Sequence, residues 1–96
     1  MKVAFTNRAV RDLREIAAYS GQQFGERVTL ALEARLQAVI TRIASSPESA
    51  PRVEQRPGMR VVTPVRYPFK IFYRIIDGTV RIVHVRHTAR RPWAGS

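Results

Sequence analysis

Apolar residues in the first half of the chain recur with two different periods. Residues 2–6 alternate between apolar and polar side chains, which predicts a short strand. From residue 8 the apolar positions follow a helical spacing as far as Gly21, and the same spacing returns from Glu26 to Ser45. Because glycine is common just beyond a helix C-terminus, Gly21 is expected to end the first helix. The pattern predicts a strand followed by two amphipathic helices.

The ends and the packing of these helices follow from a few residues. Thr6 or Asn7 can cap the first helix, since either side chain accepts hydrogen bonds from free backbone N–H groups. A link of only four residues, 22–25, predicts that the two helices pack as an antiparallel hairpin. Tyr19 and Phe24 are expected in the apolar core of that hairpin, and Val28 in the apolar stripe of its second helix.

The second half has the pattern of a sheet. Residues 47–58 are rich in proline and polar groups and predict a loop, and residues 59–63 predict a short strand. Residues 67–76 are rich in aromatic and β-branched side chains, which is typical of a central strand. Asp77-Gly78 is a strong signal for a type I′ hairpin turn, with the return strand at 79–86.

These elements predict one α+β domain spanning residues 1–96, with an N-terminal strand, a helix hairpin on one sheet face and a mainly antiparallel meander. Alternation along the central strand places four residues on the covered face: Phe69, Ile71, Tyr73 and Ile75. Three residues then point to the opposite face: Lys70, Phe72 and Arg74. A sheet face with cations around an aromatic ring suits RNA or phosphate.

Charge strengthens the expectation of an acidic partner. The 96 residues carry a formal net charge of +10, and the imbalance lies in the second half, where ten basic residues face two acidic ones. Such a field attracts phosphate backbones or acidic protein segments, and arginine suits bidentate contacts with both. An arginine-rich solvated surface without a specific partner is the alternative.

Composition narrows the other function classes. The absence of cysteine excludes disulfides and thiolate metal sites, and with two histidines and few carboxylates no metal site is expected. No glycine-rich phosphate loop or nucleophile motif points to a cofactor, so none is expected. No apolar run has membrane-spanning length and no signal peptide is evident, so we expect a cytoplasmic protein without membrane contact.

Three blocks of the chain resemble the ParE/RelE toxins of bacterial type II toxin–antitoxin pairs. Residues 67–80 are similar to the penultimate hairpin of that superfamily, residues 82–91 to its last strand and basic ending, and residues 6–13 to the entry of its helical region. The resemblance implies the same α+β fold and a growth-inhibiting toxin. It also implies a cognate antitoxin with an acidic or amphipathic segment that neutralises the toxin, and promoter DNA binding only through that antitoxin.

The two branches of this superfamily imply different targets. RelE-like toxins are ribosome-dependent mRNA endoribonucleases, and the resemblance then implies catalytic roles for Lys70, His87 and Arg90. ParE-like toxins poison DNA gyrase and are not nucleases. The chain ends at Ser96 without a match for the C-terminal tyrosine of some RelE-like members, and their paired lysines before the central strand are absent. These departures favour the ParE-like branch. Because only the RelE-like branch consists of nucleases, the chain is an enzyme only if it belongs to that branch.

Further basic residues, with one tryptophan, are candidates for binding the target or the antitoxin. They are Arg60, Arg66, Arg74, Arg86, Arg91 and Trp93. For Trp93 a packing anchor is the alternative, and His84, inside a strand, is expected to be a packed or edge histidine. A nucleic-acid-binding module without toxicity remains a third hypothesis for the whole chain.

Overall fold

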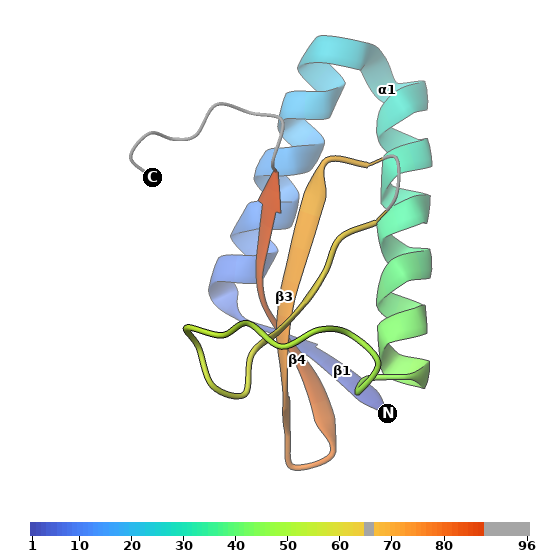
Figure 1. Ribbon diagram of the computed structural model, residues 1–96. Helices are drawn as coiled ribbons and strands as arrows, with labels where there is room; N and C mark the ends of the chain where they lie inside the picture. The colour runs from blue at the N-terminus through green and yellow to red at the C-terminus, as the bar shows by residue number, and fades with distance from the viewer. Residues whose placement is uncertain (65–66, 88–96) are drawn as a thin grey trace.

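The computed structural model describes residues 1–64 and 67–87, which form one helical element and a four-stranded sheet (Figure 1). In chain order these are β1 (Lys2–Phe5), α1 (Asn7–Ser45), β2 (Arg60–Val62), β3 (Phe69–Ile76) and β4 (Thr79–His87). The strand order is β1-β4-β3-β2, with β1 parallel to β4 and the other neighbours antiparallel. The α+β prediction is confirmed, and each predicted strand is present with shifted ends.

The helical region corrects the prediction of two helices joined by a link. α1 is a single element from Asn7 to Ser45, and residues 21–24 are helical rather than a connection. Gly25 alone departs from helical geometry, with φ 87° and ψ 177°, values that glycine adopts without strain. The chain reverses direction there (Figure 1), and the Thr29 hydroxyl donates to Ser20 Oγ at 2.9 Å across the bend. Gly25, not Gly21, is therefore where the helical path breaks.

We call residues 7–24 the first arm of α1 and residues 26–45 its second arm. The first arm begins as predicted at Thr6, whose hydroxyl oxygen accepts a hydrogen bond from the Ala9 N–H at 3.0 Å. The side chains expected to be buried at the bend are not, because Phe24 and Val28 are 62% and 47% exposed. The bend carries these residues beyond the end of the sheet.

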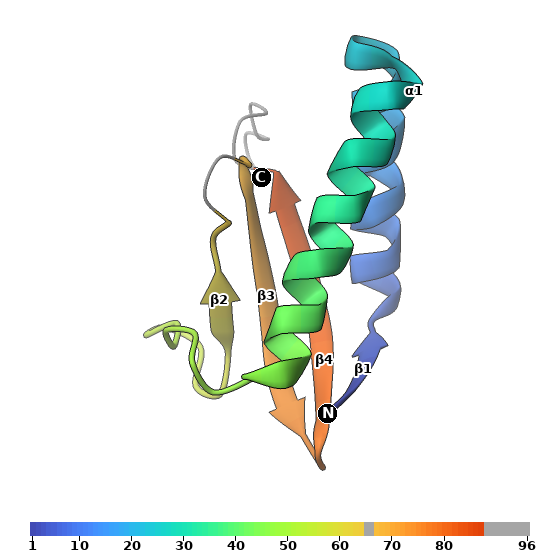
Figure 2. The ribbon, with the colours of Figure 1, turned by 90° about the vertical axis from the view of Figure 1, so that its right-hand side faces the viewer.

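The second arm lies over one face of the sheet, crossing β3 and β4 in Figure 2. Phe69, Ile71 and Tyr73 of β3 are buried on this face, as their alternation predicts. They share one apolar core with residues of both other layers: Leu36, Val39 and Ile43 of α1, and Val80, Ile82 and Val85 of β4. Burying each such side chain stabilises the fold by about 1.5–3 kcal/mol, so this face supplies most of the stability.

Two local features shape the β3–β4 hairpin. Asp77 and Gly78 have φ values of 50° and 71°, which confirms the predicted type I′ turn. Farther along, Phe72 pairs with His84 and Tyr73 pairs with Ile82, which leaves Val83 as an extra residue in a β-bulge. Thr6 holds the bulge, because its N–H donates to the Ile82 carbonyl at 3.0 Å and its hydroxyl to the Val83 carbonyl at 2.8 Å.

Within the described residues, no helix has the length and apolar character needed to cross a membrane.

Candidate functional site

The sheet face that α1 does not cover, which we call the open face, carries two directly opposed pairs of cations. Lys70 of β3 lies opposite Arg86 of β4, and Arg74 lies opposite Arg81. Like charges in directly opposed positions destabilise a sheet. The pairs therefore cost folding energy while concentrating positive potential on one surface, which suits an acidic partner.

An aromatic pair lies between these cations. Phe72 and His84 are opposed across the two strands, and their rings stack with centroids 5.6 Å apart and planes 16° apart. His84 faces this way because of the bulge. Strict alternation from the buried Ile82 would turn His84 inward, and the extra Val83 reverses the phase so that Val85 is buried instead.

A carboxylate from the helix fixes the orientation of His84. One oxygen of Asp12, in the first arm of α1, lies 2.6 Å from His84 Nδ1 and accepts a hydrogen bond from the Val85 N–H at 3.0 Å. β1 pairs with β4 only over residues 79–82, so this edge of β4 would otherwise be unpaired. Asp12 therefore caps the sheet edge and leaves His84 Nε2 directed away from the pair.

Neither Asp12 nor this role of His84 was predicted. Asp12 belongs to the polar face of a helix, and nothing in its spacing connects it with residues 72 positions away. His84 was expected to be a packed or edge histidine, and it packs on Phe72 within an inner strand of the sheet. Its carboxylate partner depends on the bulge and on the path of the first arm. No sequence signal indicates either feature.

The bulge also places His87 on the covered face. Its ring packs edge-on between Tyr19 of α1, at 5.6 Å, and Phe69, at 4.9 Å. Lys70 points to the open face, so these two predicted catalytic residues lie on opposite sides of the sheet. The third, Arg90, lies outside the described residues, as do Arg66, Arg91 and Trp93. Of the predicted binding residues, only Arg74 and Arg86 therefore join Lys70 on the open face.

Two of the predicted binding arginines hold the loop between α1 and β2. Arg60 pairs with Tyr73 on the covered side, and its Nη1 donates to the carbonyls of Glu48 at 3.0 Å and Ala50 at 2.7 Å. Arg74 donates to the Pro57 carbonyl at 3.0 Å. The Arg60 guanidinium is thus hydrogen-bonded to the loop on the covered side. Arg74 lies on the open face and also donates a hydrogen bond to the loop.

Tyr73 is fully buried on the covered face of β3, and its burial affects the ionisation of its phenol. Burial raises the pKa of its phenol, and the neighbouring Arg60 partly opposes that effect. Its hydroxyl donates to the Pro47 carbonyl at 2.6 Å. Tyr73 stays protonated near neutral pH and stabilises the fold, so it is not a general acid for the open face.

Among residues 1–64 and 67–87, no group of three or more metal-ligating side chains occurs.

Comparison with known proteins gives a consistent result. The family model described as ParE toxin of the type II toxin–antitoxin system parDE matches residues 3–92. Toxin RelE2 of Caulobacter vibrioides is 35% identical over 89 residues, which cover 93% of this chain and 97% of that protein.

Solved structures share the fold at lower sequence identity. A chain of the chromosomal ParDE system from P. aeruginosa superposes with a TM-score of 0.72 and 22% identity, covering 92% of this chain and 96% of that one. A chain of the intact E. coli RelBE toxin–antitoxin complex gives a TM-score of 0.61 and 20% identity, covering 93% and 98%. Each of these structures contains a toxin crystallised with its antitoxin or named as part of such a pair.

Proposed function

Because the chain belongs to the ParE/RelE family of toxins from type II toxin–antitoxin systems, we propose that it inhibits bacterial growth by binding DNA gyrase and that a cognate antitoxin neutralises it. Gyrase is the target that the ParE-like resemblance implies. The open face, with Lys70, Arg74, Arg81 and Arg86 around the Phe72–His84 pair, is the surface that contacts the target.

One observation carries the choice of a binding toxin over a nuclease. Cleavage of RNA needs a base, an acid and a cation gathered around one phosphate. Lys70 and His87, which the RelE-like resemblance would make partners in catalysis, lie on opposite faces of β3–β4, and His87 is packed between two aromatic rings. A basic surface on which the predicted Lys70–His87 combination does not form supports binding to an acidic region of a protein target.

A ribosome-dependent endoribonuclease is the second candidate, and it rests on a different residue. His84 lies on the open face with Lys70, and Asp12 holds its Nδ1 at 2.6 Å. Nε2 of a histidine held in this way can take a proton from a 2′-hydroxyl, while Lys70 or Arg86 stabilises the charge on phosphorus. The 35% identity to a protein named Toxin RelE2 also favours testing this candidate.

Pulse labelling after induction in a host without antitoxin distinguishes the two functions. Incorporation of labelled thymidine and labelled amino acid is followed in parallel over the first minutes. Early loss of DNA synthesis, with protein synthesis intact, is the expected result. Early loss of protein synthesis alone would overturn the gyrase proposal in favour of the endoribonuclease.

Two variants then test the residues. Purified protein is added to a gyrase supercoiling assay, where Arg81→Gln is expected to weaken inhibition severalfold because it removes one cation of the Arg74–Arg81 pair. His84→Ala is the matched variant for the nuclease, since it removes the histidine that would act as the base in this second candidate function. If His84→Ala abolishes toxicity in a protein that remains folded while Arg81→Gln has no effect, binding through the cationic pairs is excluded.

A further inference from the structure

His84 lies between the cation pairs of the open face, and it is a side chain whose charge can change near neutral pH. Its side chain is 20% exposed, and its ring stacks on Phe72. Asp12 lies 2.6 Å from Nδ1, whereas Nε2 forms no hydrogen bond with any residue that the structure describes. Because histidine ordinarily gains or loses its charge between about pH 5 and pH 8, the proton on this ring can respond to what binds the open face.

Two neighbours of His84 favour the protonated ring. The Asp12 carboxylate attracts an imidazolium at hydrogen-bond distance. The Phe72 ring, with its centroid 5.6 Å away, adds a cation–π attraction. Arg8 and Glu15 lie one helical turn before and after Asp12, and both are exposed, so their opposite charges offset each other.

Four cations on the two strands act against the proton. They are Lys70 and Arg74 on β3 and Arg81 and Arg86 on β4. Arg86 lies two residues beyond His84 on the same face, about 7 Å along the strand, and a nearby like charge disfavours the imidazolium. β1 does not alter this balance, because its Lys2 pairs with Thr79 at the far end of β4. The charge on His84 is thus decided between one carboxylate and several cations.

An acidic partner changes that balance. Carboxylates that pair with Lys70 and Arg86 cancel part of the positive potential around His84, and one of them can accept a hydrogen bond from Nε2 of the imidazolium. Both effects stabilise the protonated ring more in the complex than in the free protein. By thermodynamic reciprocity, protonation of His84 raises the affinity for the partner by the same factor by which the partner favours protonation.

We infer that His84 is a proton-linked contact of the open face, which takes up a proton when an acidic polypeptide segment binds. Asp12 holds the ring so that Nε2–H donates to a carboxylate of that segment. The inference rests on the proposed function, in which an acidic region of the target meets this face. Binding then tightens as the pH falls from about 8 to about 6. In the neutral ring the same Nε2 carries a lone pair, which a carboxylate repels.

The chemistry of the face favours carboxylates over a nucleic-acid strand. Bases would need an aromatic ring with a free face on which to stack. Phe72 and His84 already stack on each other with planes 16° apart, so the ring surfaces between them are occupied. Carboxylates need only cations and the Nε2 donor, and the open face supplies both.

The test uses a rhodamine-labelled peptide of about ten aspartates, whose carboxylates stay ionised above about pH 5. Fluorescence anisotropy measures its dissociation constant for the intact protein at about pH 6 and about pH 8, at one salt concentration. Binding to the wild type should tighten about fivefold to tenfold at the lower pH, which is the lower end of coupling between linked sites. His84→Gln keeps a polar side chain that does not titrate, so its affinity should change less than about twofold. Both proteins retain His87, so the comparison isolates His84.

The ring itself and its carboxylate partner supply a second measurement. Proton–nitrogen correlation spectra of the histidine rings report the protonation of His84 directly. Adding the peptide at about pH 7 should move both ring nitrogens of His84 toward the imidazolium state. Asp12→Asn keeps an oxygen for the Val85 N–H but removes the charge. This variant should show a smaller shift on peptide addition and a weaker pH dependence of binding, which a purely structural role of Asp12 would not produce.

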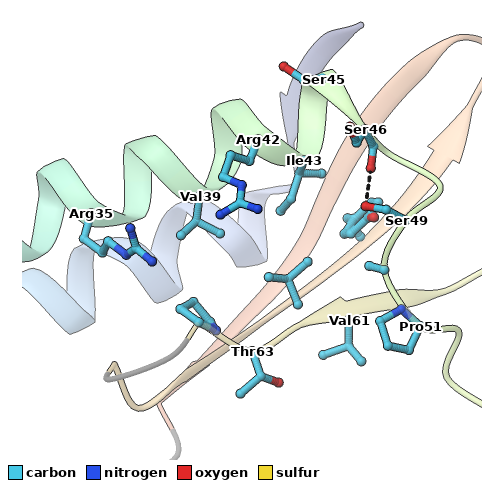
Figure 3. Close-up of a pocket in the computed structure, with 14 residues that line it drawn as sticks. Arg35, Val39, Arg42, Ile43, Ser45, Ser46, Ser49, Pro51, Val61 and Thr63 are labelled. Atoms are coloured by element: carbon cyan, nitrogen blue, oxygen red, sulfur yellow. Dashed lines mark hydrogen bonds between the residues drawn. The ribbon is translucent and has the colours of Figure 1, made fainter.

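Arginines elsewhere on the molecule provide the control for charge alone. Arg35 and Arg42 of α1 point toward a pocket of about 850 Å³ on the covered side of the sheet (Figure 3). Arginine stays protonated throughout this pH range, so peptide bound there contributes no pH dependence. Arg42→Gln should therefore weaken binding by a similar factor at each pH and keep the wild-type ratio of affinities.

The contrary outcomes are distinct. Equal pH dependence in His84→Gln and the wild type would overturn the inference, as would ring nitrogens that do not respond to the peptide or a peptide that binds at neither pH. The same His84-dependent effect with a single-stranded oligonucleotide, and not with the peptide, would assign the contact to nucleic acid instead. Growth inhibition is measured separately by pulse labelling. A toxic protein without the pH dependence keeps the proposed function and loses the inference, whereas a pH-linked contact in a protein that does not inhibit growth refutes the proposed function alone.

Discussion

On the helix-covered face of the β3–β4 hairpin, the cross-strand pairs are apolar or aromatic, whereas on the open face two pairs join like charges. Ile71 opposite Val85 is typical of the first set, and Arg74 opposite Arg81 of the second. The backbone and the turn are the same for both faces. Successive side chains of a strand point to opposite faces. In this hairpin, residues on one face stabilise the fold, and residues on the other are available to bind a partner.

The largest effect is expected from the covered face. Ile71→Ala should lower the free energy of unfolding by about 2–5 kcal/mol, since Ile71 is fully buried and the change leaves a cavity. Urea denaturation followed by circular dichroism measures the change. Ile71→Val is the control and should cost about 0.5–1.5 kcal/mol. Equal stability of the alanine variant and the wild type would mean that this face does not dominate stability.

The next largest loss of stability is expected at the edge of β4 that β1 does not cover, where Asp12 binds His84 and Val85. Asp12→Ala removes the acceptor of the Val85 N–H and the partner of His84, so we expect a loss of about 1–3 kcal/mol in unfolding free energy. Asp12→Asn keeps an oxygen that can accept from the Val85 N–H and should cost less. Faster hydrogen exchange at Val85 in the alanine variant reports the edge directly. Unchanged exchange there would show that Asp12 does not cap β4.

Tyr73 provides a pH-dependent test of the covered face. Removing its hydrogen bond to Pro47 in Tyr73→Phe should cost about 0.5–1.5 kcal/mol at neutral pH. Burial raises the pKa of Tyr73 above the unfolded value of 10.0, so its contribution is fully present below pH 10 and is lost as pH rises through the folded pKa. Denaturant midpoints between pH 8 and about pH 11 should therefore fall more steeply for the wild type than for the variant. Parallel slopes would contradict the assignment.

The smallest effect on stability, and the sharpest contrast, is expected from the open face. Arg81→Gln relieves the repulsion with Arg74 and should raise the unfolding free energy by about 0.2–1 kcal/mol. The same variant should inhibit growth less than the wild type when both are expressed at equal levels. If Arg81→Gln destabilised the protein and left it fully toxic, the open face would serve stability rather than binding, which contradicts the proposed difference between the two faces.

The periodicity of apolar residues and the turn residues predicted the strands and the hairpin turn correctly, but they did not predict where the helical region bends. The alternation of β3 and the Asp77-Gly78 turn depend on neighbours within a few residues, and both were predicted from sequence. The bend at Gly25 was misplaced at Gly21, because either glycine can end a helix in isolation. Only the packing of the two arms around Ser20 and Thr29 selects between them.

The candidate site was predictable in part for the same reason. Lys70 and Arg74 follow directly from alternation along β3. His87 was expected near the basic residues, but the extra Val83 in β4 reverses the alternation and turns it toward Tyr19 and Phe69. A bulge of one residue carries little local signal, yet it changes the face of every residue that follows it.

The sequence by itself determined the α+β class, the strand pattern, the basic charge and the family, since these depend on composition, period and motifs along the chain. The tertiary structure decided which residues share a surface. The Asp12–His84 pair joins residues 72 positions apart, and the rings of Tyr19 and His87 meet only because the first arm of α1 packs against β4. Contacts of this kind depend on how the elements pack, and local spacing carries no record of that packing.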